Sequence, residues 1–172
     1  LEYEKGMASF EDEKIDESSG ILVGSLVLQS FVNNIVPSST PDAWLKKQRL
    51  VIDGKITVAG AILFAEEPQV VLPKPAVQVS RYKTSEAATR ESLDGQPETI
   101  EGCAYDQIKH SVARVVEIVE SIPIIKDAGF ERIVYPDNAL HEIITNAIIH
   151  RDYSISDDVH VIVFNNRIEI AS

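Results

Sequence analysis

The chain has 172 residues, of which 44% are apolar and 25% charged, enough apolar content for one full-sized core or two small ones. Its net charge of −11 opposes strong DNA binding, since that binding relies on lysine and arginine displacing counterions from phosphate. No apolar run approaches the roughly 20 residues that span a bilayer, and the acidic first residues do not form a signal peptide. The single cysteine, Cys103, excludes an internal disulfide and a multi-cysteine metal site. We therefore expect a cytoplasmic protein without a membrane partner.

The first part of the chain is acidic and then apolar. Residues 1–19 are expected to form an extended, partly mobile lead-in, because they contain few apolar side chains. Residues 21–36 carry an apolar stripe that predicts a helix, although their β-branched content weakens helix propensity. The segment 37–41, with a proline at each end, breaks that helix.

Two further short helices are expected before residue 65. Ser39 or Thr40 can cap a helix over 42–48, and Thr57 can cap one over 58–64. Between them, residues 50–54 are typical of a strand that enters a tight Asp-Gly turn. Residues 20–75 are thus compatible with a winged-helix-like unit or with an α+β connector. The connector is favoured, because 58–64 contains none of the donors that read bases.

Residues 76–172 are expected to form an α/β region. An alternating strand at 76–82 is followed by a polar loop and by a strand at 98–101 that pairs with it. Apolar residues three and four apart predict a long helix over 104–121. Further elements are expected at 130–135 (strand or extended arm), 136–150 (helix), 159–164 (strand) and 167–171 (antiparallel strand). The predicted fold class is α+β, with helices packed on a small mixed or antiparallel sheet.

The helix expected over 136–150 carries the candidate chemistry. At about 100° per residue, one face is apolar, and Glu142 and Asn146 share the opposite face, with His150 one turn further. The apolar face comprises Leu140, Ile143, Ile144, Ala147 and Ile148. A carboxylate can act as a general base, and an amide oxygen can ligate Mg²⁺. The imidazole and Arg151 can meet phosphate oxygens. Ile149 projects near the polar pair, which suggests that this face is covered by something. Spacing alone favours a solvated helix face.

A family resemblance strengthens the functional reading. Residues 135–154 follow the pattern Tyr-Pro-x-x-Ala-Leu-x-Glu-x-x-x-Asn-Ala-x-x-His-Arg-Asp-Tyr-Ser. This run resembles the signature of the RecG-like C-terminal, HATPase-type family of bacterial transcriptional regulators. Residues 56–64 and 164–170 are similar to two further segments of that family, so the likeness covers about residues 50–172. Family members are also known as ATP-dependent DNA helicase RecG-related proteins. They usually carry an N-terminal Schlafen/AlbA-like domain, to which DNA binding is attributed.

The resemblance also implies an incomplete nucleotide site. The helix is similar to the N-box of GHKL ATPases, in which the position of Glu142 activates water, that of Asn146 binds Mg²⁺ and that of His150 lies near phosphate. No Asp-x-Gly-x-Gly box follows before Ser172, and no P-loop is present, so motor activity is not expected. Because the chain starts at Leu1 and ends in a strand, we expect a fragment of a longer protein. ATP and Mg²⁺ are expected only in the full-length protein, as a weak ATPase at most, and the fragment is expected to be inactive.

Two alternatives to nucleotide binding arise from the same residues. The region can be a non-catalytic dimerisation or scaffold domain, since the strand at 167–171 offers an edge that invites pairing in a homodimer. Direct DNA binding through residues 21–64 is disfavoured by the charge. DNA is expected to bind only through a domain outside this fragment.

Overall fold

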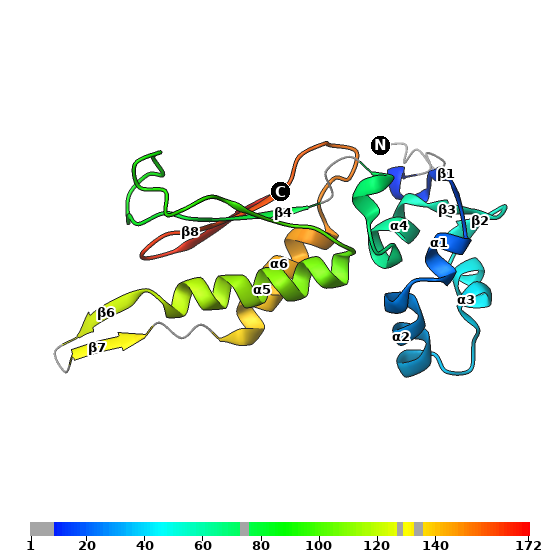
Figure 1. Cartoon of the computed structure of the whole chain (residues 1–172), viewed down its shortest axis with the longest axis horizontal. Helices are drawn as coiled ribbons and strands as arrows, with labels where there is room; N and C mark the ends of the chain where they lie inside the picture. Colours follow the sequence, from blue (N-terminus) through cyan, green and yellow to red (C-terminus); the bar gives the residue numbers. More distant parts are fainter. Residues whose placement is uncertain (1–8, 73–75, 127–128, 133–135) are drawn as a thin grey trace, which may run out of the picture. The chain divides into compact units, whose positions relative to one another are not determined.

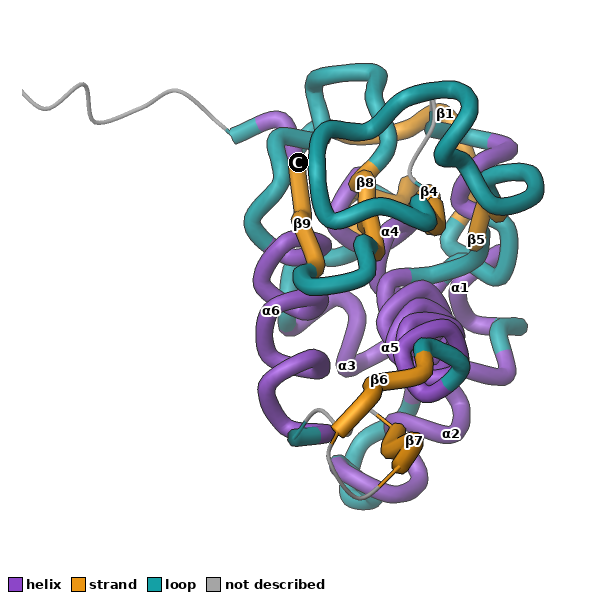
Figure 2. Tube along the Cα trace, turned by 90° about the vertical axis from the view of Figure 1, so that its left-hand side faces the viewer, coloured by secondary structure: helices purple, strands orange, loops and turns teal. Residues whose placement is uncertain are grey.

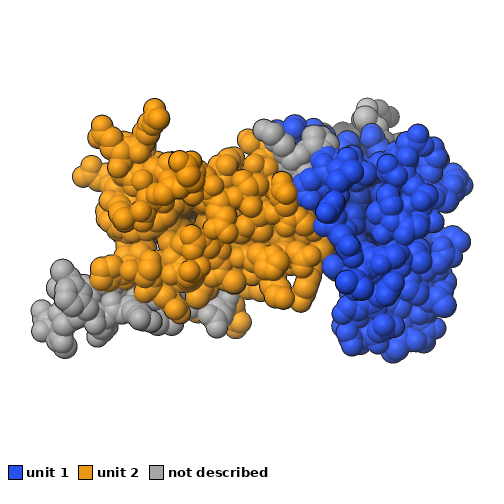
Figure 3. All heavy atoms as spheres, in the orientation of Figure 1, with its two compact units in different colours: residues 1–75, 153–156 blue, residues 76–152, 157–172 orange. Residues whose placement is uncertain are grey.

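The computed structural model describes residues 9–72, 76–126, 129–132 and 136–172 (Figure 1). The described residues form both helices and strands, and the strands pair into small sheets, so the predicted α+β class is confirmed. The chain divides into two compact units, which Figure 3 colours separately. Unit 1 contains residues 1–75 and 153–156, and unit 2 contains residues 76–152 and 157–172. Among the described residues, no helix is long and apolar enough to cross a bilayer.

Unit 1 is a small three-stranded antiparallel sheet with short helices. Its strand order is β1-β3-β2. Its elements are η1 (Phe10–Asp12), β1 (Lys14–Ser18), α1 (Gly20–Val23), α2 (Leu26–Ile35), α3 (Pro41–Lys47), β2 (Val51–Ile52), β3 (Lys55–Thr57), α4 (Val58–Phe64) and η2 (Pro68–Val70). Strand β1 lies within the segment expected as a lead-in. It pairs with β3, and an ion pair of 2.5 Å joins Lys55 to Asp16. Backbone pairing thus orders a stretch whose composition alone favours mobility.

The single helix predicted over 21–36 is wrong, because the chain breaks there into α1 and α2. The break falls at Gly24 and Ser25, and Ser25 caps α2 by accepting a hydrogen bond from the backbone N–H of Leu28 at 3.4 Å. Serine competes for backbone groups and favours caps over helix interiors. The two predicted threonine caps are confirmed. Thr40 accepts from the N–H of Ala43, and Thr57 accepts from that of Gly60.

Unit 2 is built on a four-stranded mixed sheet with two long helices. The strand order is β5-β4-β8-β9, in which only the β4–β8 pair is parallel. Its elements are β4 (Val77–Arg81), β5 (Glu98–Ile100), α5 (Ala104–Glu120), β6 (Pro123–Lys126), β7 (Gly129–Arg132), α6 (Asp137–Ile149), β8 (Val159–Val163) and β9 (Ile168–Ala171). Figure 2 shows α5 and α6 together on one face of this sheet. The predicted pairing of the strands at 76–82 and 98–101 is confirmed.

A separate hairpin joins β6 and β7, with Pro123 opposite Arg132. The sequence predicts the second of these strands at 130–135, but its partner β6 was not predicted. Proline begins β6, where the helical pattern of α5 ends. Residues 133–135 lie outside the described part of the chain.

Candidate functional site: the exposed face of helix α6

Helix α6 is anchored by one apolar stripe. Leu140, Ile144 and Ile148 are at most 2% exposed, and α6 packs against α5. The prediction that Ile143 belongs to this core face is wrong, since its side chain is 52% exposed. The buried residues recur every fourth position, and Ile143 lies about 100° from the centre of their stripe. It therefore borders the polar face instead of the core.

The polar face carries the predicted pair. Glu142 and Asn146 are both exposed on α6, one helical turn apart. Ile149 beside them is 53% exposed. His150 is the C-cap of the helix, where its N–H donates to the carbonyl of Asn146 at 3.0 Å, and its side chain is exposed. The structure thus brings Glu142, Asn146, Ile149 and His150 to the exposed side of the helix and its end.

Arg151 is placed elsewhere, so the sequence-based expectation that it meets a phosphate is not supported by its position. The residue is only 8% exposed. Its guanidinium donates to the carbonyl of Ala76 at 3.4 Å, just before β4, and to that of Asp157, just before β8. The N–H of Val159 donates to the same Ala76 carbonyl at 3.1 Å. Arg151 therefore joins the end of α6 to the starts of the two parallel strands.

The side chains on this face do not form a metal site by themselves. No group of three or more His, Cys, Asp or Glu side chains that could hold a metal occurs among the described residues. Magnesium, however, usually takes one or two protein oxygens and completes its shell with phosphates and water. The exposed amide of Asn146 fits the role of such a single ligand beside a bound phosphate. The carboxylate of Glu142, one turn away, can hold a water or accept its proton.

A cavity in unit 2 was missed by the sequence reasoning. It has a volume of about 580 Å³ and is lined by Arg81, Lys83, Asp94, Ser121, Ile122, Pro123 and Asn165. Arg81 lies within the strand predicted at 76–82, Lys83 follows that strand, and Asn165 follows the strand predicted at 159–164, so each residue could be placed from the sequence. Only the parallel pairing of β4 with β8, which the sequence does not specify, brings their ends together.

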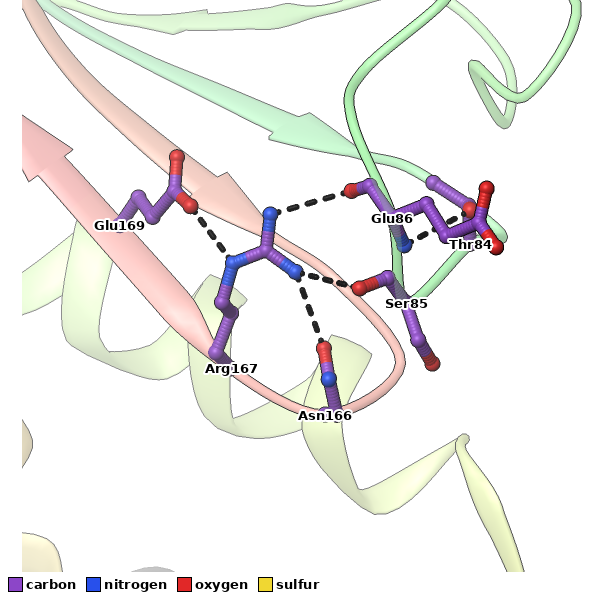
Figure 4. A network of polar contacts seen from close by, with 6 residues as sticks. All are labelled: Thr84, Ser85, Glu86, Asn166, Arg167 and Glu169. Atoms are coloured by element: carbon purple, nitrogen blue, oxygen red, sulfur yellow. Dashed lines mark hydrogen bonds and ion pairs between the residues drawn. The ribbon is translucent and has the colours of Figure 1, made fainter.

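Arg167 holds the loop that follows β4 (Figure 4). Its guanidinium donates to the carbonyls of Ser85 at 2.8 Å and Glu86 at 3.1 Å. It also pairs with Glu169 at 2.6 Å and lies over the ring of Phe164, 3.8 Å from the ring centre. The loop after β4 is therefore fixed to the turn between β8 and β9.

Comparison with known proteins identifies a structure with a similar fold but does not identify a function. No protein-family model matches the chain, and no curated protein matches it in sequence. Its structure is similar to the crystal structure of the DIP2311 protein from Corynebacterium diphtheriae, with a TM-score of 0.64 and 15% identity. The match covers 95% of this chain and 32% of that one, so this chain spans about a third of the length of DIP2311. At this identity the likeness concerns the fold alone.

Proposed function

We propose that this chain is part of a bacterial transcriptional regulator in which the α6 face contributes one side of an Mg-ATP site. The observation that carries the proposal is the joint exposure of Glu142 and Asn146 beside Ile143 and Ile149, on a helix fixed by its buried stripe. Binding sites for small molecules combine apolar surface with a few well-placed polar groups. DNA binding is assigned to a domain outside these 172 residues.

The exposure of Ile143 and Ile149 favours a ligand that covers this face of α6. Burying a whole isoleucine side chain is worth about 1.5–3 kcal/mol, so two half-exposed ones leave a comparable amount to be gained by an apolar cover. Single exposed apolar residues are common on protein surfaces. Two of them flanking a carboxylate and an amide provide both an apolar contact and polar ligands. This combination fits a nucleotide better than a purely solvated face.

Each residue has a distinct role in the proposed site. The amide oxygen of Asn146 ligates Mg²⁺ together with the phosphates, and bound Mg²⁺ neutralises phosphate charge. Glu142 holds a water or accepts its proton, and His150 lies near a phosphate. Arg151 acts as a positioning residue, because it fixes the end of α6 to the sheet. In this scheme the site is completed by residues of the full-length protein, which at most hydrolyses ATP slowly.

Calorimetric titration of the full-length protein with Mg-ATP tests the proposal. We expect saturable heat that is lost in Asn146→Ala, while Glu142→Gln keeps binding and stops any hydrolysis. Asn33→Ala removes another exposed asparagine, from helix α2 of unit 1, and serves as the matched control. Absence of heat with the wild-type protein, or equal heat in Asn146→Ala, would exclude this function.

A second candidate function is self-association through strand β9, which lies at the edge of the four-stranded sheet. The N–H of Phe164 donates to the carbonyl of Arg167, so these two residues form a hydrogen-bonded pair. Hydrogen-bonded and non-hydrogen-bonded pairs alternate along an antiparallel ladder, so the N–H groups of Ile168 and Ile170 point away from β8. Such an open edge can pair with the same strand of a second copy.

Light scattering over a concentration series tests this alternative. Ile170→Pro removes one outward N–H without breaking the ladder to β8, and Ile170→Val retains it. A homodimer that dissociates in the proline variant alone supports edge pairing. A wild-type chain that stays monomeric at high concentration eliminates it.

A further inference from the structure

The cavity of unit 2 lies where the two parallel strands end. Arg81 is the last residue of β4 and is opposite Val163, the last residue of β8. Lys83 and Asn165 follow each strand by two positions, and both line the cavity. In open sheets with parallel strands, ligands bind in the crevice outside the carboxyl ends of those strands. The volume of about 580 Å³ also falls in the usual range for small-molecule sites.

The strand side of the cavity is basic in an otherwise acidic chain. Arg81 and Lys83 supply two positive charges and Asp94 one negative charge, whereas the whole chain carries −11. The guanidinium of Arg81 is held in place, since it donates to the carbonyls of Val163 at 3.2 Å and of Tyr82 and to the side-chain oxygen of Asn165. Burial lowers the pKa of Arg81 from its usual value, and Asp94 opposes that shift.

The side chain of Lys83 is also available to an incoming anion. Lys83 pairs with Asp94 at 2.8 Å, but both side chains remain well exposed, at 66% and 40%. Exposed pairs of this kind are worth at most about 1 kcal/mol, so a bound anion can replace the carboxylate of Asp94 as the partner of Lys83. A guanidinium binds carboxylate and phosphate groups with a fixed geometry, and the ammonium group of a flexible lysine adds a second positive charge.

The walls of the cavity are preformed. The N–H of Asp94 donates to the carbonyl of Arg81 at 2.7 Å, and the N–H of Lys83 donates to that of Ser92 at 2.7 Å. Arg167 fixes the same loop from the other side through the carbonyls of Ser85 and Glu86. A site whose walls are already ordered avoids most of the entropic cost of ordering a loop on binding.

The opposite wall indicates that the ligand is more than a bare ion. It is the carboxyl end of α5, where Ser121 caps the helix and its hydroxyl donates to the carbonyl of Ile118 at 2.6 Å. Helix carboxyl ends carry partial negative charge and would repel an anion placed there. Ile122 is 7% exposed, and Pro123 lies next to it on the same wall. This side therefore suits an apolar or hydrogen-bond-donating part of a molecule.

We propose that this cavity binds a small organic anion, with its carboxylate or phosphate group between Arg81 and Lys83 and its apolar part against Ile122 and Pro123. The site shares no residue with the α6 face, so it stands or falls independently of the proposed Mg-ATP site.

Nuclear magnetic resonance titration of the 172-residue chain tests the site. The probes are phenyl phosphate and benzoate, with inorganic phosphate as the bare anion, all at an ionic strength held constant with sodium chloride. We expect saturable shifts of the backbone amides of Lys83, Asp94, Ile122 and Asn165. The aromatic probes should bind more tightly than inorganic phosphate, and comparison of phenyl phosphate with benzoate tells a phosphate site from a carboxylate site.

Charge variants make the test specific. Lys83→Gln should weaken binding roughly threefold to tenfold, and Asp94→Asn should tighten it by a similar factor, because the competing carboxylate is gone. Lys109→Gln removes an exposed lysine from α5 and should leave the affinity unchanged. Arg81→Lys provides a second weakening variant that keeps the charge but loses the guanidinium geometry.

Several outcomes would overturn the site. Shifts that rise linearly without saturation, or an equal loss of affinity in Lys83→Gln and Lys109→Gln, would show general charge screening. Weaker binding in Asp94→Asn would place the anion elsewhere. Inorganic phosphate binding as tightly as phenyl phosphate would refute the apolar wall.

Discussion

Replacement of Arg151 by methionine tests how much this buried side chain stabilises unit 2, without changing the exposed residues of the proposed site. Methionine retains most of the apolar stem but removes the guanidinium that donates to the carbonyls of Ala76 and Asp157. Hydrogen bonds from a charged donor contribute about 1.5–3 kcal/mol each, and the Ala76 carbonyl still accepts from Val159 in the variant. We therefore expect unit 2 to lose about 3 kcal/mol, roughly a hundredfold in its unfolding equilibrium.

Hydrogen exchange followed by mass spectrometry measures this loss in unit 2 alone. The single tryptophan, Trp44, lies in unit 1, so its fluorescence serves as an internal reference that should not change. Protection should fall most in the peptide that contains Val159. Arg90→Met, at an exposed position of the same unit, is the matched control and should change stability by no more than about 0.5 kcal/mol. If Arg151→Met were no more destabilising than Arg90→Met, the anchoring role of this arginine would be refuted.

Three further predictions concern other parts of the chain. Gly60→Ala should destabilise unit 1 by about 1–3 kcal/mol in urea unfolding, because a Cβ there would lie 2.6 Å from the carbonyl oxygen of Leu50. A gain in stability from helix propensity alone would contradict this prediction. Burial raises the pKa of the Cys103 thiol. At pH 8 this thiol should therefore react with Ellman's reagent on the order of a hundredfold more slowly in the folded chain than in urea. Equal rates in the two states would contradict its burial. Since the folded-state pKa is raised, this thiol should also reduce stability as the pH rises above its unfolded value of about 8.5. Arg167→Gln should free the loop after β4 and speed tryptic cleavage after Arg90 several-fold, as measured by electrophoresis. An unchanged cleavage rate would show that the network in Figure 4 does not restrain the loop.

Local signals in the sequence predicted most of the secondary structure. The caps at Thr40 and Thr57 act through neighbours three residues away, so they are visible in any short window. The long apolar stripe of α5 and the asparagine turn between β8 and β9 are equally local. These elements form where the sequence places them because each depends on interactions within one or two helical turns or one hairpin.

Features that depend on distant segments were not predictable in the same way. The parallel pairing of β4 with β8 joins positions 82 apart, and nothing in either strand specifies its partner. The cavity at their ends could not be foreseen for that reason. The exposure of Ile143 depends on which part of α6 faces α5 and the sheet, and the burial of Arg151 depends on two carbonyls before β4 and β8. Tertiary contacts thus decide which of the candidate residues on α6 and just after it remain accessible.

The run from Glu142 to Arg151 therefore combines two physical roles. The fold accounts for Arg151, which is buried and bonded to the backbone before both parallel strands. It does not account for Glu142 and Asn146, which are exposed on α6. Loss of binding in Asn146→Ala with unchanged hydrogen exchange would locate function on the exposed face. Loss of binding in Arg151→Met together with reduced protection would instead show that the site needs an anchored helix, because a helix whose end is released cannot hold a ligand geometry.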